Sequence, residues 1–341
     1  MVAMAAPTHP LRIFGISGAI TLVTIILVWI YLGPQAALIT ALLSIIEITF
    51  SFDNAIINAK ILKTMSPFWQ KLFLTVGIVI AVFGMRLVFP IAIVAITSGL
   101  SWQTVIDLAL NNPEKYAHSL ESSYPLITAF GGSFLLMLGL HFFFNKAQTT
   151  FWLPFESMLA RIGHWWVPLI PAVLAVFALS RIPGHPDSTG ALIAGIAGIC
   201  VYLVIHTLSS TMEHNKSLNS VKHKTGLAAF WSFLYLEVLD ASFSFDGVLG
   251  AFAITSDVVI IAAGLGIGAF WVRSLTVYMV RRELLDQYKY LEHGAHYTIL
   301  LLAVVLLASV FVHLPEAVPG LLGLGIIGLS VYASRREGKK A

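Results

Sequence analysis

Residues 48–59 read ITFSFDNAIINA, and residues 241–252 read ASFSFDGVLGAF. The tetrapeptide Phe-Ser-Phe-Asp occurs in both stretches, at 50–53 and at 243–246, and each copy lies inside a long apolar run. A charged side chain in the hydrocarbon interior of a bilayer costs roughly 3 kcal/mol or more, so it is rare there unless it has a function. The recurrence of the motif therefore indicates that two parts of the chain serve one purpose.

The composition around the motif indicates a polytopic membrane protein. Of 341 residues, 58% are hydrophobic and 11% are charged, and the mean hydropathy is +0.87. Soluble domains carry about twice as many charged residues. The formal charge of +3 is too small and too scattered to suggest a nucleic-acid partner, and the single Cys200 excludes an internal disulfide or a thiolate cluster.

Apolar runs of the length needed to cross a bilayer, roughly 20 residues, predict ten membrane helices. The first run is longer than the apolar core of a signal peptide, so we expect a retained helix. The ten predicted spans are 11–33, 35–59, 72–98, 124–145, 166–182, 189–210, 226–254, 258–280, 296–313 and 317–334.

The basic residues predict the orientation of these spans. With the N-terminus inside, sixteen Lys and Arg fall on the cytoplasmic side, two (Lys115 and Arg181) fall on the other side, and Arg86 and Arg273 lie within helices. Cytoplasmic loops are enriched in Lys and Arg. The sequence therefore predicts a multi-pass protein of the cell membrane with both termini in the cytoplasm.

The tetrapeptide belongs to a longer internal repeat. Aligning Asp53 with Asp246 places Glu47 on Asp240 and Ser51 on Ser244, and it is followed by a match of GIVIAVFGMR (77–86) with GLGIGAFWVR (264–273). The second match places Arg86 on Arg273. The copies begin at the second and seventh predicted helices, an odd number apart, so the second copy would be inverted in the membrane.

Inverted repeats are a transporter architecture with the substrate site at the membrane midplane between the repeats. We therefore predict an all-α polytopic fold with two inverted three-helix repeats. The predicted organisation is an N-terminal extra helix (1–34), repeat 1 (35–145), connecting helices with a cytoplasmic loop (146–224), repeat 2 (225–315) and a C-terminal helix with a basic tail (316–341).

Five acids lie within the predicted spans, and each is a candidate site residue. They are Glu47, Asp53, Glu237, Asp240 and Asp246. Arg86 and Arg273 could neutralise two of them in structural ion pairs, for which Glu47 and Asp240 are the best placed. A bound cation or protonation would have to neutralise the others.

At about 100° per residue, Glu47, Ser51, Asn54 and Asn58 share one helical face. We favour a ligand or proton-carrying role for Glu47 because of these oxygen-bearing neighbours, with the ion pair to Arg86 as the alternative. Asp53 would point about 100° away from Asn54, so either the helix unwinds or the acids serve two surfaces. In the second repeat Gly247 and Gly250 favour a break in the helix, whereas the first repeat has no comparable breaker.

Carboxylate, amide and hydroxyl oxygens suit hard cations such as Mn²⁺, Ca²⁺ or Mg²⁺. The candidate ligands are Asp53, Asn54, Asp246, Glu47, Asp240, Ser51, Ser244 and Glu237, with Arg86 and Arg273 as charge partners. We expect His141 and His206 to be interfacial or core residues rather than ligands. Metal sensing by His214 and His223 in the loop at 213–224 is a remoter alternative.

At these residues the sequence resembles the TerC family of tellurium-resistance-associated membrane proteins. The family pattern of an acid followed by Ser-x-Asp-Asn is carried by Glu47, Ser51, Asp53 and Asn54, and FDGVLGAFAIT (245–255) is similar to its second motif. This chain has Gly247 where the family has serine and Leu249 where it has proline. The resemblance implies a lysine-exporter-like fold and export of a divalent cation, Mn²⁺ above all, with Asp53, Asn54 and Asp246 as ligands.

Three functions remain open at this point. The first is a secondary transporter that exports Mn²⁺, with Ca²⁺ as a possible substrate and protons as a counter-ion, without enzymatic activity or a prosthetic group. The second is an intramembrane aspartyl hydrolase with Asp53 and Asp246 as its dyad, although a Gly-x-Gly-Asp signature is missing. The third is a membrane partner of a metal-handling or tellurite-stress complex. The oligomeric state does not follow from the sequence.

Overall fold

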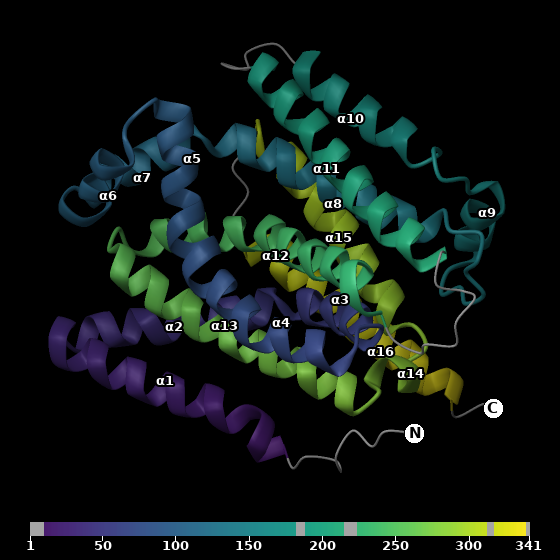
Figure 1. The fold of residues 1–341 in the computed structure, drawn as a ribbon, viewed down its shortest axis with the longest axis horizontal. Coiled ribbons are helices and arrows are strands. Elements are labelled where there is room, and N and C mark those ends of the chain that lie inside the picture. Colours follow the sequence, from purple (N-terminus) through teal and green to yellow (C-terminus); the bar gives the residue numbers. More distant parts are fainter. Residues whose placement is uncertain (1–9, 182–187, 215–223, 312–316, 339–341) are drawn as a thin grey trace. The chain divides into compact units, whose positions relative to one another are not determined.

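The protein is helical throughout the part that its structure describes. A computed structural model describes residues 10–181, 188–214, 224–311 and 317–338 (Figure 1). Within these ranges there is no β-strand, and the regular elements are sixteen α-helices and one π-helix. The predicted all-α class is confirmed.

Within the described part of the chain, eight helices are long and apolar enough to cross a membrane, which confirms a polytopic membrane protein. A ninth span results if a bent pair of helices, α2 and α3, is counted as one. The helices with their bounds are α1 (Pro10–Leu32), α2 (Pro34–Phe50), α3 (Phe52–Lys63), α4 (Pro67–Val79), η1 (Ile80–Val88), α5 (Phe89–Ser98), α6 (Trp102–Asn111), α7 (Pro113–Ser122), α8 (Tyr124–Phe143), α9 (Pro154–Ile162), α10 (Leu169–Arg181), α11 (Ser188–His214), α12 (Gly226–Ile254), α13 (Val258–Arg281), α14 (Leu284–Gln287), α15 (Leu291–Ser309) and α16 (Ala317–Gly338).

The predicted spans agree with this set except at α10. The fifth predicted span, 166–182, corresponds to a helix whose apolar part covers only Leu169–Leu179. The third, 72–98, is a continuous rod of α4, the π-helix η1 and α5. Proline opens several helices, among them α2, α4 and α9, at the position where its missing N–H is not needed.

The described chain forms two compact units. The first comprises 1–121 and 243–287, and the second comprises 122–242 and 288–341. In the first unit, α13 packs along α2, α3 and η1, and α1 packs on α2 and α13. In the second unit, α8 packs on α11 and α15, and α15 also packs on α16.

Each unit thus joins helices from both predicted repeats. The first combines α2 of repeat 1 with α13 of repeat 2, and the second combines α8 with α15. The two units are defined by packing and do not test which segments arose by duplication. The limits of the repeats therefore stay a prediction.

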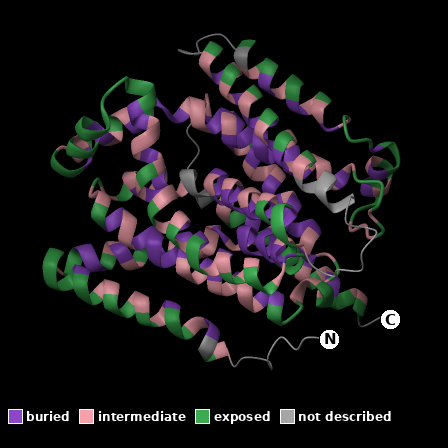
Figure 2. Ribbon diagram, in the orientation of Figure 1, coloured by how far each residue is buried: buried purple, intermediate pink, exposed green. Residues whose placement is uncertain are grey.

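Burial differs strongly between the helices. Only 17% of the apolar window of α1 is buried, against 61% for α8 and α15, a contrast that is visible along the ribbons in Figure 2. Helix α1 therefore presents most of its surface outward, as expected of a helix surrounded by lipid. Its contacts with α13 are polar and aromatic, with Ser17 Oγ donating to the carbonyl of Phe270 at 3.0 Å and Phe14 stacked on Trp271.

Candidate functional site

The first Phe-Ser-Phe-Asp motif lies at a break between two helices. Helix α2 ends at Phe50, α3 begins at Phe52, and the two axes differ by 54°. Ser51 at the break has φ −91° and ψ 19°, outside the regular helical region. The glycines made a break more credible in the second copy, at Gly247 and Gly250, but α12 is continuous from Gly226 to Ile254.

A serine side chain lies at the break, where the chain has neither glycine nor proline. Ser51 Oγ donates to the side-chain oxygen Glu47 Oε1 at 3.1 Å, one turn earlier on α2. The Ser51 N–H still bonds to the Glu47 carbonyl at 3.0 Å, so the bend loses little backbone bonding.

Beyond the break, α3 begins with buried polar side chains. Asp53, Asn54 and Asn58 are all buried, and the Asn54 backbone N–H donates to Asp53 Oδ1 at 2.9 Å. Asp53 in the first turn of α3 is also favourably placed for the helix dipole, which is the structural alternative to a ligand role.

Two amide atoms in this turn have no hydrogen-bond partner among the described residues. They are Asn54 Oδ1, an acceptor, and Asn58 Nδ2, a donor. Buried polar atoms are satisfied in the large majority of cases, so an unsatisfied pair beside a buried carboxylate calls for an explanation. An oxygen acceptor next to a carboxylate can bind a cation.

Glu47 forms the ion pair that the sequence left as an alternative. Arg86 Nη2 donates to Glu47 Oε1 at 2.5 Å, and both side chains are buried. Arg86 lies in the π-helix η1, and its Nη1 donates to the carbonyl of Ala81 at 2.5 Å, five residues earlier. The structure thus places Glu47 between Ser51 and Arg86, while a ligand role for this acid stays a prediction.

Glycines bring the second motif and α13 close to this acid. A Cβ atom on Gly247 would lie 3.0 Å from Glu47 Oε2, and one on Gly268 would lie 2.3 Å from Glu47 Cγ. Likewise a Cβ on Gly264 would lie 2.6 Å from Leu43 Cβ on α2. The backbone of the second motif therefore lies beside the first motif, as the repeat led us to expect.

The remaining predicted residues are placed as follows. The backbone of Ser244 and Asp246 belongs to α12, but their side chains lie outside the part of the chain that the structure describes. Glu237 and Asp240 are buried on the part of α12 that belongs to the second unit. His214 has only its backbone described, at the end of α11, and His223 lies outside the described residues.

Arg273 differs from its repeat counterpart. Its guanidinium donates to the carbonyls of Phe73 and Gly77, both at 3.2 Å, and lies 3.7 Å from the centre of the Phe73 ring. It therefore ties α13 to α4 through backbone oxygens. The alignment of Arg86 with Arg273 stays a prediction.

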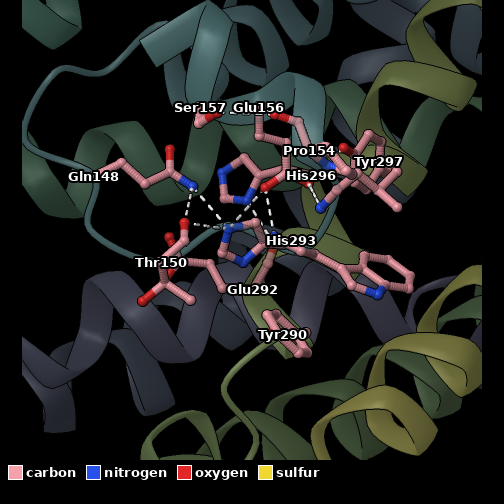
Figure 3. Close-up of polar contacts among 12 residues, drawn as sticks. Gln148, Thr150, Pro154, Glu156, Ser157, Tyr290, Glu292, His293, His296 and Tyr297 are labelled. Carbon is pink, nitrogen blue, oxygen red and sulfur yellow. Dashed lines mark hydrogen bonds and ion pairs between the residues drawn. The ribbon is translucent and has the colours of Figure 1, made fainter. Parts of the chain in front are cut away.

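Sequence reasoning missed a buried polar cluster around Glu156 and His293 in the second unit (Figure 3). Glu156 accepts hydrogen bonds from Tyr297 Oη at 2.5 Å and from the backbone N–H of Trp152 at 2.8 Å, and its Oε2 lies 3.3 Å from His293 Nε2. The same ring nitrogen contacts the Thr150 carbonyl at 2.9 Å. Pro154 followed by Glu156 is a helix-start pattern that could have indicated α9, but no local pattern gives its partners on α15.

His141 and His206 face each other in the second unit, with ring centroids 4.1 Å apart, and Tyr202 stacks on His206. The sequence predicted interfacial or core histidines rather than ligands at these positions, and it did not predict that the two rings would meet. No group of three His, Cys, Asp or Glu side chains suited to a metal ion occurs among the described residues. Asparagine oxygens are not among these side-chain types, and the side chain of Asp246 is outside the described part of the chain.

The fold and the site define an all-α, multi-pass membrane protein with a buried polar turn at a helix break. Residues 52–341 match the family described as "Protein of unknown function (DUF475)", and the chain belongs to this family. The match includes Asp53, Asn54 and Asp246 and begins just after Ser51. Comparison with curated proteins and with solved structures found no match.

Proposed function

We propose that this protein is a transporter of divalent metal cations in the cell membrane, and that Mn²⁺ efflux is its activity. The observation that carries the proposal is the buried pair of Asp53 and the unsatisfied Asn54 Oδ1, at a break between apolar helices. Broken helices that expose polar groups at membrane depth are typical of ion sites in transporters.

The donor set favours a hard cation. A carboxylate and an amide oxygen, together with backbone carbonyls near a break, suit Mn²⁺ or Ca²⁺ better than Zn²⁺ or Cu⁺. Asp246, one residue before the glycine that faces Glu47, would supply a second carboxylate from the other repeat. The resemblance to TerC proteins supports Mn²⁺ over Ca²⁺, export over import, and transport over covalent chemistry.

Glu47 and Arg86 would hold the site rather than bind the ion. A carboxylate that already accepts bonds from Arg86 and Ser51 has little negative charge left for a cation. Its second oxygen faces Gly247, so the pair fixes the distance between the two motifs.

Transport into proteoliposomes tests the proposal. Asp53→Asn removes a charge needed to dehydrate a divalent ion, and Asn54→Leu removes the oxygen acceptor at similar volume, so we expect each to reduce Mn²⁺ flux at least tenfold. The matched control is Asp107→Asn on α6, which removes an acid that is exposed. Flux of the wild-type protein over a panel of Mn²⁺, Ca²⁺, Mg²⁺ and Zn²⁺ identifies the substrate. Wild-type flux in both site variants would remove Asp53 and Asn54 from the site, and absence of flux for every ion would overturn the function.

A further inference from the structure

The short helix α9 has two faces of opposite character. Its inner face carries Glu156 and Ala160, which are 1% and 5% exposed. Its outer face carries Phe155, Met158 and Ile162, which are 47%, 59% and 54% exposed. These three residues follow the spacing of three and four that places side chains on one side of a helix.

The inner face is fixed firmly to the second unit. At the N-terminal end, Glu156 binds Tyr297 of α15, and its Oε2 contacts His293 (Figure 3). At the C-terminal end, a Cβ atom on Gly163 would lie 1.8 Å from the carbonyl oxygen of Phe144, so only glycine fits there. These contacts fix the orientation of α9, so its apolar face points away from the rest of the second unit.

The position of α9 along the chain identifies what covers that face. Helix α8 is a membrane span that ends at Phe143, and Gly163 at the end of α9 touches the next residue, Phe144. The exposed Trp165 and Trp166 follow directly, before the apolar helix α10. A helix held against the end of a membrane span lies at the level of the membrane surface, where Trp side chains are enriched.

The charges of this segment fit an anionic surface. Between Phe144 and Pro168 the only acid is Glu156, and it is buried. The basic side chains Lys146 and Arg161 are exposed, and Lys146 Nζ lies 3.1 Å from His164 Nε2. Helix α6 offers a contrast, because its exposed apolar residues Ile106 and Leu110 are accompanied by the exposed acid Asp107.

We propose that α9 is an in-plane anchor that binds an anionic phospholipid surface. Phe155, Met158 and Ile162 enter the boundary between headgroups and acyl chains, and Lys146 and Arg161 bind lipid phosphates. Interfacial helices of this kind combine apolar burial with attraction to anionic lipids. The buried contacts of Glu156 transmit the position of α9 to α15, so the lipid surface would act on the second unit through this helix.

Spin labels on single cysteines test the anchor, since Cys200 is the only native cysteine. In a Cys200→Ser background, Phe155→Cys, Met158→Cys and Ile162→Cys are labelled one at a time in full-length protein in vesicles. Thr149→Cys, in the exposed loop before α9, is the aqueous reference. We expect labels on the apolar face to collide more often with oxygen, and the reference label more often with a water-soluble nickel chelate.

Lipid composition separates headgroup binding from simple burial. In vesicles of phosphatidylcholine with added phosphatidylglycerol, we expect the three labels to move deeper than in phosphatidylcholine alone. The variant Lys146→Gln/Arg161→Gln should abolish that shift. An unchanged depth in the two mixtures would overturn the assignment of anionic lipid as the ligand of Lys146 and Arg161.

Two outcomes would overturn the anchor itself. The first is nickel accessibility at all three positions equal to that at Thr149, which would place the face in water. The second is spin–spin broadening that disappears on dilution with unlabelled protein, which would show a second copy of the chain on this face. A measurement without labels supports the same decision: Trp165→Phe should remove part of the fluorescence that brominated lipids quench, and no change in quenching would contradict the proposal.

Discussion

Glu47 connects three parts of the first unit. Its carboxylate accepts from Arg86 of η1 and from Ser51 at the break, and it faces Gly247 of the second motif. A buried carboxylate and a buried guanidinium each depend on the other for charge compensation. We therefore expect the charge of Glu47 to stabilise the packing of the first motif against the second.

Removing one charge of this pair should destabilise the protein. Glu47→Gln leaves the Arg86 guanidinium buried without its carboxylate, a change that typically costs about 3–5 kcal/mol. The double variant Glu47→Gln/Arg86→Gln should recover part of this loss, since neither charge is then left alone. Thermal unfolding of the purified protein in detergent measures both effects. Equal stability of the single variant and the wild type would show that the pair is not structural, and lost transport in a stable protein would restore the ligand role of Glu47.

Glycine 268 should not tolerate a methyl group. Its Cβ would lie 2.3 Å from Glu47 Cγ and 2.5 Å from Glu47 Cβ, so Gly268→Ala must push α13 away from α2. Overpacking of this kind typically costs about 1–3 kcal/mol. The control is Gly328→Ala in α16, where nothing lies within 4 Å and the helix should gain slightly in stability. The prediction fails if both variants unfold at the same temperature as the wild type.

At the scale of helices, the sequence predicted the spans better than their irregularities. Length and hydropathy located the long helices to within a few residues because lipid sets both quantities. The break at Ser51 was missed because the chain has neither glycine nor proline at that point. The π-helix around Arg86 was also missed. Arg86 bonds to Glu47, which is 39 residues away, and no local sequence pattern indicates such a partner.

The attachment of α9 depends on one acid. Glu156→Gln keeps the volume but replaces one acceptor oxygen by a donor amide, which conflicts with the Tyr297 hydroxyl or the Trp152 and Leu153 N–H groups. We expect α9 to detach more often and the segment before it to be cleaved by protease several times faster in detergent. Tyr297→Phe removes only one of these bonds and should have a smaller effect. Equal cleavage rates in Glu156→Gln and the wild type would show that the cluster does not hold α9.

At the scale of the whole molecule, α10 decides the number of crossings. With 13 residues it is about 20 Å long, shorter than the hydrocarbon core of about 30 Å. If it does not cross, every later segment changes side, and the basic residues divide into seven on one side and eleven on the other. The charge asymmetry of sixteen to two exists only if α10 crosses.

Contacts within the units agree with crossing by α10. In the second unit, Thr150 after α8 meets His293 at the start of α15, with α10 and three long spans between them. In the first unit, Lys63 after α3 forms an ion pair with Asp286, with α10 and five long spans between them. Segments that touch lie on the same side of the membrane, so each pair requires an even number of crossings. Neither parity could be read from hydropathy, because α10, the fifth predicted span, is too short for the usual criterion.

Two further contacts within the units predict the side of both termini. Phe14 near the start of α1 packs on Tyr278 near the end of α13, and Lys289 in the following loop pairs with Glu337 at the end of α16. We therefore expect both ends of the described chain on the side of the loop between α13 and α15. The basic residues of that loop predict a cytoplasmic location for this side.

Labelling with a membrane-impermeant maleimide in intact cells tests this topology in a Cys200→Ser background. If α10 crosses, Asp187→Cys after α10 and the control Glu114→Cys in α7 should react in intact cells, because both are predicted outside. Arg336→Cys near the C-terminus and Thr8→Cys near the N-terminus should react only after permeabilisation. If α10 does not cross, Asp187→Cys becomes protected while Arg336→Cys becomes reactive, so the two positions must change together. That reversed pair would reject the ten-span topology and, with it, the inverted relation of the two Phe-Ser-Phe-Asp motifs, which requires an odd number of crossings between the starts of the repeats.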